Sequence, residues 1–307
     1  MINWPDRNYW KEKYTIDSSQ AKFAINGISS IGNPKNNSVI FSKGLDEQFL
    51  NNLSSIHGSI IITKPEFQEL VSTLTVSNGF LFDEDPRYRF AEILEPFWTP
   101  RSLRGSLTWN EQYQLYIGKN VTIHPSAYIE PNVIIGDNSI IWEGVSIFSG
   151  AKIGPGVTVG SYSIIRENAV IGGWGFGIAQ KKGCRSIRLP HIGGVSIGQY
   201  VEIGALSTVC SGTIDPTVIE DEVKINDHVH IAHNCKICKN AFVMACVDVS
   251  GSVTIGEASW IAPNSSIING VSIGCNATVG IGAVIINNVE DSEVVVGNPG
   301  RIIRVKE

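Results

Sequence analysis

An aliphatic residue returns at every sixth position over a large part of the chain, from Ile117 to Ile285. Four residues after each comes a small or β-branched residue, as in Val121, Ala127 and Val133. A period of six matches neither the helical repeat of about 3.6 residues nor the two-residue alternation of a half-buried strand. It is typical of a parallel β-helix, in which three short strands and three turns make one triangular coil. The sequence therefore predicts a mainly β fold with about eight stacked coils.

Two breaks interrupt this repeat. The first covers residues 173–192 and is rich in glycine and aromatic residues, and the second covers Cys210 to Thr217. Because the repeat resumes after each break, we expect both segments to leave the β-helix as surface loops. Long loops on a rigid scaffold often carry function. The first break is therefore either part of a functional site or a tolerated insertion.

Residues 1–105 lack the sixfold repeat and show a mixed α/β pattern. We expect a small N-terminal α/β domain over residues 1–105, which binds a nucleotide, and a β-helix domain over residues 106–307. The second domain includes the loop insertion 173–192 and a short C-terminal tail. Within the first domain, the pattern predicts strands at 38–42, 58–63 and 73–76 and helices at 46–54 and 86–94.

Composition narrows the functional classes. The chain of 307 residues has 31 glycines, only 17% charged residues and a net charge of -5. The glycines suit a turn-rich β architecture, and the negative charge argues against nucleic acid as a partner. No apolar run reaches the roughly 18–20 residues needed for membrane insertion, and the N-terminus does not resemble a signal peptide. We therefore expect a cytoplasmic protein.

The 6 cysteines suit free thiols in a reducing compartment. Cys235-x-x-Cys238 has the spacing of half a zinc site, but no second pair follows it. Cys235 also falls on the small inward position of its hexad, where a thiol packs as a compact hydrophobic group. We therefore expect packing rather than metal binding, with no metal and no permanently bound cofactor.

Several motifs carry a resemblance to a known family. They are Gly175-Phe176-Gly177-Ile178-Ala179, Leu189-Pro190-His191-Ile192-Gly193-Gly194-Val195, Val201-Glu202-Ile203-Gly204-Ala205 and His230-Ile231-Ala232-His233-Asn234. In this order they resemble the nucleotide-sugar N-acyltransferases of the hexapeptide-repeat superfamily, in particular the UDP-3-O-acylglucosamine N-acyltransferases. The resemblance covers both domains. It implies a left-handed β-helix, a homotrimer with active sites between adjacent helices, and acyl transfer from a thioester to the amine of a nucleotide-linked sugar.

The resemblance assigns the catalytic base. The family's Ile-Ala-His-Asn run, in which the histidine acts as base, matches Ile231 to Asn234 and makes His233 the candidate. An imidazole with an ordinary pKa of about 6.5 can accept the amine proton at cellular pH. His233 follows the inward Ile231 by two residues, so we expect it on the outer face. His228 and His230 remain alternative contacts, and we count His228 and Asn234 as candidate substrate-binding residues.

Two further residues are candidates for substrate binding. Glu143, on the outer face, either hydrogen-bonds a sugar hydroxyl and orients the amine or is a solvated charge. Phe41 falls where the resemblance implies an aromatic ring stacked on the nucleotide base, and its alternative role is that of a core residue.

The donor side has its own candidates. Gly175, Phe176 and Gly177 lie in the glycine-rich break, where closely approaching backbone N–H groups can stabilise an oxyanion. Arg301 and Arg304, with Lys306, either meet the phosphates of coenzyme A or form a solvated basic tail.

The chain departs from the family pattern in several places. Gly44 and Glu47 replace the residues that grip uracil, Cys210-Ser211-Gly212 replaces an Asp-Arg-Gly run, Val271 replaces a second histidine, and no helices follow the β-helix. These departures favour transfer of an acyl group, acetyl or a 3-hydroxyacyl such as 3-hydroxybutyryl, from acyl-coenzyme A to a dTDP- or UDP-linked amino sugar for a surface glycan. One alternative is a UDP-3-O-(3-hydroxyacyl)glucosamine N-acyltransferase of lipid A biosynthesis that uses acyl carrier protein. The other is a non-catalytic β-helix scaffold.

Overall fold

The computed structural model describes residues 9–10, 13–14, 16, 25–45, 47–74, 77–98 and 107–305. The chain divides into two compact units. The first unit combines Met1–Pro100 with Gly177–Pro190, and the second combines Arg101–Phe176 with His191–Glu307. This division differs from the predicted one, in which the whole insertion 173–192 stayed with the β-helix.

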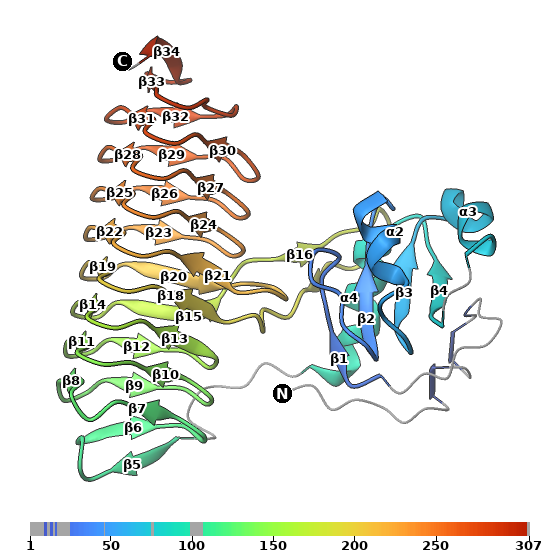
Figure 1. The fold of residues 1–307 in the computed structure, drawn as a ribbon, viewed down its shortest axis with the longest axis horizontal. Helices are drawn as coiled ribbons and strands as arrows, with labels where there is room; N and C mark the ends of the chain where they lie inside the picture. Colours follow the sequence, from blue (N-terminus) through green and yellow to red (C-terminus); the bar gives the residue numbers. More distant parts are fainter. Residues whose placement is uncertain are drawn as a thin grey trace. The chain divides into compact units, whose positions relative to one another are not determined.

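The second unit is a parallel β-helix with three faces, seen as a stack of coils in Figure 1. Face 1 contains β7 (Thr122–Ile123), β10 (Ile140–Ile141), β13 (Val157–Val159), β18 (Val195–Ile197), β21 (Thr217–Ile219), β24 (Lys236–Ile237), β27 (Thr254–Ile255) and β30 (Ser272–Ile273). Face 2 contains β8 (Tyr128–Ile129), β11 (Ser146–Ile147), β14 (Ile164–Ile165), β19 (Glu202–Ile203), β22 (Lys224–Ile225), β25 (Phe242–Val243), β28 (Trp260–Ile261), β31 (Thr278–Val279), β33 (Glu293–Val296) and β34 (Arg301–Val305). Face 3 contains β5 (Thr108–Asn110), β6 (Leu115–Ile117), β9 (Ile134–Ile135), β12 (Lys152–Ile153), β15 (Val170–Trp174), β20 (Thr208–Ser211), β23 (His230–Ile231), β26 (Asp248–Val249), β29 (Ser266–Ile267) and β32 (Val284–Ile285).

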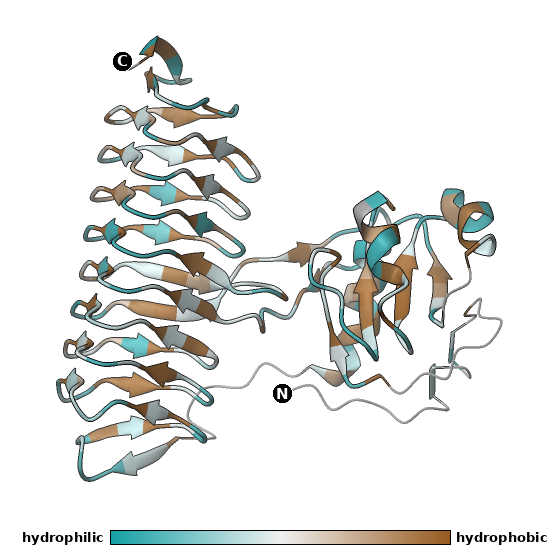
Figure 2. Cartoon of the chain, in the orientation of Figure 1, coloured by the Kyte–Doolittle hydropathy of each residue, from teal (hydrophilic) through white to brown (hydrophobic). Residues whose placement is uncertain are grey.

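The sixfold aliphatic positions form the core of this unit. Ile141 pairs in register with Ile123 on one side and Val159 on the other, so equivalent side chains stack along the axis. Ile225 and Ile237 are likewise no more than 2% exposed. Brown apolar strands recur from coil to coil in Figure 2. The predicted number of coils is confirmed, since Face 1 has 8 strands.

The corners of the coils use residues that tolerate a left-handed backbone. Asn138 and Asn168 have φ of 58°, and Asn264 has φ of 59°. Asparagine adopts this region more readily than other non-glycine residues, because its short side chain can hydrogen-bond locally. His228 (φ 59°) and Asn234 (φ 60°) occupy the same kind of corner position.

The first unit contains a parallel sheet in the order β1-β2-β3-β4 together with short helices. Its elements are β1 (Gly27–Ile28), β2 (Ser38–Phe41), α2 (Glu47–Leu53), β3 (Ile60–Thr63), η1 (Pro65–Phe67), α3 (Gln68–Ser72), β4 (Gly79–Phe82), α4 (Pro86–Leu94) and η2 (Glu95–Phe97). Asp85 caps α4 by accepting a hydrogen bond from Tyr88 N at 3.0 Å. The predicted strands near 38–42 and 58–63 and the helix at 86–94 are confirmed. The helix predicted at 46–54 is confirmed over Glu47–Leu53, and Asp46 lies outside the described residues.

The strand predicted at 73–76 is wrong over its described part. Thr73 N donates to Leu70 O at 3.2 Å and Leu74 N donates to Val71 O at 3.0 Å, so both residues close the turn that ends α3. Residues 75 and 76 lie outside the described residues. The fourth strand of the sheet is β4 instead, which the sequence pattern missed.

Most of the insertion packs in the first unit as an antiparallel hairpin of β16 (Ile178–Ala179) and β17 (Ile187–Arg188). Ala179 and Ile187 are 1% and 2% exposed. Burial of these apolar side chains explains why the segment is not a simple surface loop.

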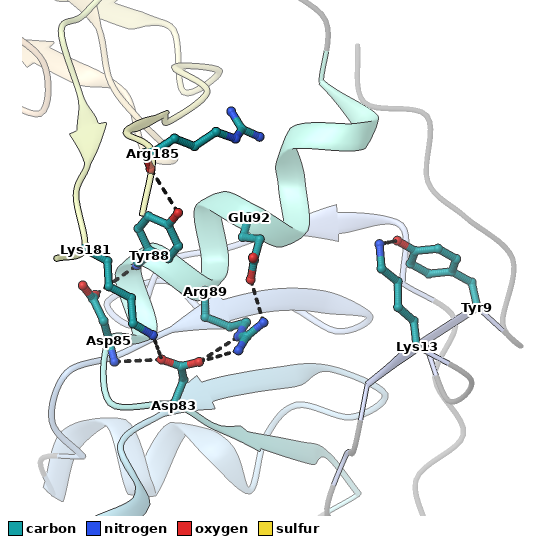
Figure 3. A network of polar contacts seen from close by, with 9 residues as sticks. All are labelled: Tyr9, Lys13, Asp83, Asp85, Tyr88, Arg89, Glu92, Lys181 and Arg185. Carbon is teal, nitrogen blue, oxygen red and sulfur yellow. Dashed lines mark hydrogen bonds and ion pairs between the residues drawn. The ribbon is translucent and has the colours of Figure 1, made fainter. Parts of the chain in front are cut away.

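Polar contacts also hold the hairpin to α4 (Figure 3). Tyr88 Oη donates to Arg185 O at 3.0 Å, and Lys181 Nζ lies 3.5 Å from Asp83 Oδ1. Arg89 forms a second ion pair with Asp83 at 2.8 Å. Partial burial raises the pKa of Asp83, but a backbone hydrogen bond from Asp85 and the Arg89 guanidinium outweigh it, so the pKa is lowered overall.

Candidate functional site

His233 lies at the corner between Face 3 and Face 1, directly after β23, and is half-buried. Two glycines make room for it. A Cβ atom at Gly251, one coil further along, would stand 2.8 Å from His233 Cε1 and 3.0 Å from Nε2. A Cβ atom at Gly175 would stand 2.8 Å from His233 Cβ. The imidazole therefore packs against bare backbone, which fixes its place at the corner.

A second imidazole adjoins the first. The ring centroids of His191 and His233 are 4.9 Å apart, with the rings inclined at 62° in an edge-to-face arrangement. His191 is only 4% exposed. A Cβ atom at Gly175 would also stand 2.8 Å from His191 Cδ2 and Nε2. His191 belongs to the motif Leu189 to Val195, but the sequence pattern did not mark it as a site residue.

The two breaks in the repeat meet next to this imidazole pair. Ile192 N donates to Thr213 O at 3.1 Å, and Gly193 N donates to Gly212 O at 2.9 Å. A Cβ atom at either Gly193 or Gly212 would overlap the Asp215 carbonyl oxygen. The glycines therefore permit the two loops to pair closely, and this pairing fixes the backbone that carries His191.

Asn234 connects the His233 corner to the second loop. Its Oδ1 accepts a hydrogen bond from Thr213 N at 2.7 Å, and its Nδ2 donates to Thr213 Oγ1 at 3.2 Å. The amide that the sequence suggested for substrate binding is thus engaged with the protein. In this arrangement Asn234 positions the loop beside His233.

The other two histidines of the motif region lie in the same coil but elsewhere on it. His228 is exposed at the corner between β22 and β23. His230 is exposed on Face 3, with Nδ1 2.6 Å from Thr208 Oγ1. Of the three, only His233 has a described histidine ring contact, the one with His191.

Glu143 lies at a different corner, between β10 and β11, more than three coils from His233. At about 4.8 Å per coil this is roughly 17 Å along the axis. The side chain is exposed, and its hydrogen bond to Tyr162 raises the pKa of that phenol. Within one chain, Glu143 and His233 therefore do not share a site.

The predicted donor-binding residues are also spread out. Gly175 is buried beside the imidazoles and Phe176 is 81% exposed, whereas Gly177 belongs to the first unit, where its carbonyl accepts from Leu189 N at 2.9 Å. Arg301 and Arg304 are exposed on β34, which pairs with β33 more than three coils beyond His233. Lys306 lies outside the described residues.

Phe41 ends β2 in the first unit and is half-buried, with its ring centroid 4.7 Å from that of Phe90. One part of the ring thus packs against α4. The remaining exposed part leaves both the core and the base-stacking interpretations in place.

The cysteine motif shows packing. Cys235 is 1% exposed, and its Sγ donates to Ser250 O at 3.1 Å. Burial raises the pKa of Cys235 and of Cys210 to about 11, so both thiols are neutral near pH 7. Among the described residues, no group of three or more His, Cys, Asp or Glu side chains is placed to hold a metal. None of the helices in the described ranges is long and apolar enough to cross a bilayer.

Comparison with known proteins places the chain in a family. Residues 115–149 match the bacterial transferase hexapeptide model of six repeats. A UDP-3-O-acylglucosamine N-acyltransferase from Campylobacter lari is 33% identical over 287 residues, which cover 90% of this chain and 86% of that protein. The chain belongs to the UDP-3-O-acylglucosamine N-acyltransferase family. A member from Coxiella burnetii is 40% identical over 200 residues, covering 59% of this chain and 55% of that protein.

Solved structures agree with the UDP-3-O-acylglucosamine N-acyltransferase assignment at the level of the fold. A UDP-N-acetylglucosamine O-acyltransferase from Moraxella catarrhalis superposes with a TM-score of 0.56 at 25% identity, over 62% of this chain and 73% of that chain. The predicted left-handed parallel β-helix is confirmed. The prediction of an acyltransferase enzyme is confirmed as well, which leaves the scaffold alternative without support.

Proposed function

We propose that this protein transfers a 3-hydroxyacyl group from acyl carrier protein to the amine of UDP-3-O-(3-hydroxyacyl)glucosamine. The observation that carries this proposal is the 33% identity with a UDP-3-O-acylglucosamine N-acyltransferase over 90% of the chain. The match extends through both units and includes the corner at which His233 stands. It reverses the order of preference drawn from the sequence, in which coenzyme A was the donor.

The reaction needs a base for the amine proton and hydrogen-bond donors for the oxyanion. The amine nitrogen attacks the thioester carbonyl carbon, the new C–N bond forms, and the C–S bond breaks with the thiolate as leaving group. His233 accepts the proton that the amine loses and can return it to the thiolate. The half-buried position at a glycine-lined corner leaves the imidazole accessible to a substrate while its orientation is held.

The oxyanion formed during attack needs donors close by. The backbone beside Gly175 is the candidate, because no side chain separates it from the two imidazoles. A backbone N–H group in this place could approach the oxyanion closely, as expected of the glycine-rich break.

A second candidate function keeps coenzyme A as donor and a dTDP- or UDP-linked amino sugar as acceptor. Two departures from the family pattern favour this candidate. Val271 stands in place of the family's second histidine, and Gly44 stands in place of a residue that binds uracil. Val271 is 8% exposed and packs in the β-helix core. A Cβ atom at Gly44 would meet nothing within 4 Å, so an altered base or sugar would find room there.

We also propose that the protein assembles as a homotrimer. Large apolar side chains stand exposed along the outside of the β-helix, among them Tyr128 (57%), Trp142 (48%) and Trp260 (41%). Exposed aromatic residues of this size often mark protein contacts. The proposed enzyme would act in the cytoplasm, where nucleotide sugars and acyl carrier protein occur together.

A donor-by-acceptor screen tests these alternatives. The purified protein is incubated with UDP-3-O-(3-hydroxyacyl)glucosamine or with dTDP- and UDP-linked amino sugars, each with 3-hydroxyacyl carrier protein, 3-hydroxyacyl-CoA or acetyl-CoA. Products are measured by mass spectrometry. We expect a mass gain on the glucosamine acceptor only with the carrier protein. Turnover of a different amino sugar with coenzyme A thioesters alone would reject the proposal in favour of the second candidate.

A further inference from the structure

The imidazole beside His233 is unusual for its burial. His191 is 4% exposed, although it carries a polar, ionisable side chain. Buried polar side chains are costly unless they serve packing, bonding or function. Its ring edge contacts His233 at a centroid distance of 4.9 Å. The two loops that pair through Ile192–Thr213 and Gly193–Gly212 hold it there.

We propose that His191 is a positioning residue that orients the His233 ring and keeps it neutral. This inference rests on the proposed role of His233 as base. A base must be unprotonated when the amine loses its proton. Two imidazoles at this distance resist double protonation, because a second positive charge would lie close to the first. His191 thus widens the pH range in which His233 can accept a proton.

The expected shift of the His233 protonation transition follows from repulsion between the two protonated rings. Repulsion of about one pKa unit between the two protonated rings, which share the first proton, lowers the half-protonation point of His233 by half of that amount, roughly half a pH unit. The same sharing makes the wild-type transition broader than a one-proton step.

Other ionisable groups lie on the loops and strands next to the pair, and they are the same in wild type and in the His191 variants. On the loops and strands packed around it they are the neutral thiols Cys210 and Cys235, the carboxylates Asp215 and Asp248, and the imidazole of His230. Asp248 pairs in register with His230 on Face 3, and Asp215 is exposed in the second loop. A change confined to His191 therefore isolates the contribution of that ring.

The first test measures protonation without turnover. Protein labelled with 13C-histidine is titrated by NMR as wild type, H191Q and H191F, with H233Q used to assign the His233 resonance. We expect the His233 transition to move up by about half a pH unit and to sharpen to a one-proton step in both variants. An unchanged transition in both variants would overturn the proposal.

The second test measures function. The acid limb of the kcat/KM profile should move upward by the same amount in H191Q and H191F, so the variants lose most activity at low pH and least at high pH. H124Q, which alters a half-buried histidine bonded to Ser126 in the first coil, should keep the wild-type profile. Loss of rate at every pH with an unshifted limb would show packing alone and would overturn the proposal.

The two tests separate this inference from the proposed function. If no donor and acceptor pair gives turnover, the proposed function fails, but the NMR transition still decides whether His191 governs the protonation of His233. Melting temperatures of the variants, compared with wild type, show that the fold is retained.

Discussion

At the residue scale, the site depends on glycines, whose lack of a side chain lets other groups come close. Glycines at 175 and 251 let backbone approach the His233 ring, and glycines at 193 and 212 let two loops approach each other. Any larger residue would overlap backbone or imidazole atoms at these places. The candidate base is therefore held by close packing, which requires the imidazole to fit one narrow space.

Replacement of His233 by alanine or glutamine tests the base directly. We expect kcat to fall about 10²- to 10⁴-fold, the usual contribution of a general base, while the melting temperature stays near that of wild type. Single-turnover assays with the best donor and acceptor give the measurement. A variant with near wild-type rate would remove His233 from the mechanism and return His228 and His230 to consideration.

Gly251→Ala tests the packing around the ring. The added Cβ would lie 2.8 Å from His233 Cε1, too close for an undisturbed contact, and the movable group is the imidazole. We expect at least about a 10-fold loss of kcat with a small change in melting temperature, because turning one side chain costs little stability. Gly32→Ala, where a Cβ meets nothing within 4 Å, is the matched control. Equal rates in the two variants would contradict a strict requirement for the present ring position.

At the element scale, the hairpin β16–β17 is held to α4 by buried apolar groups and by Asp83. Because the pKa of Asp83 is lowered in the folded state, its contribution to stability is present above the ordinary value of 3.8 and is lost as pH falls through the lowered value. We expect Asp83→Asn to destabilise the first unit by about 1–2 kcal/mol at pH 7 and by less near pH 3.

Hydrogen exchange mass spectrometry in increasing urea measures this effect on peptides from residues 79–94 and 177–190. Glu84→Gln changes the neighbouring exposed carboxylate and should leave the exchange unchanged. An Asp83→Asn variant whose stability loss is the same at both pH values would show that the carboxylate charge is not the source.

The elements also show what the sequence could and could not predict. The Ile225 and Ile237 positions were predictable because each depends only on a local period that repeats along the chain. The docking of the hairpin was not, because it needs contacts such as Tyr88–Arg185 between segments 97 residues apart. His191 was missed for the same reason, since its place beside His233 arises from pairing between two irregular loops.

At the scale of the whole molecule, the number of coils between two residues of the β-helix sets their separation along its axis. His233 follows β23, Glu143 lies more than three coils before it, and Arg301 lies more than three coils after it. Rotation about an axis parallel to the β-helix leaves these heights unchanged. A cyclic trimer of the proposed kind therefore brings a neighbour's Glu143 no closer in height to His233, although it can bring the corners side by side.

This geometry decides what Glu143 can do. A carboxylate roughly 17 Å away along the axis cannot orient the attacking amine, but it can contact a distant part of an extended substrate. We expect Glu143→Gln to keep kcat within about 2-fold of wild type and to act, if at all, on KM for the nucleotide sugar. Steady-state kinetics beside His233→Gln make the comparison. A loss of kcat as large as that of the histidine variant would mean that coils of different height meet at one site, and a parallel cyclic trimer would then be the wrong assembly.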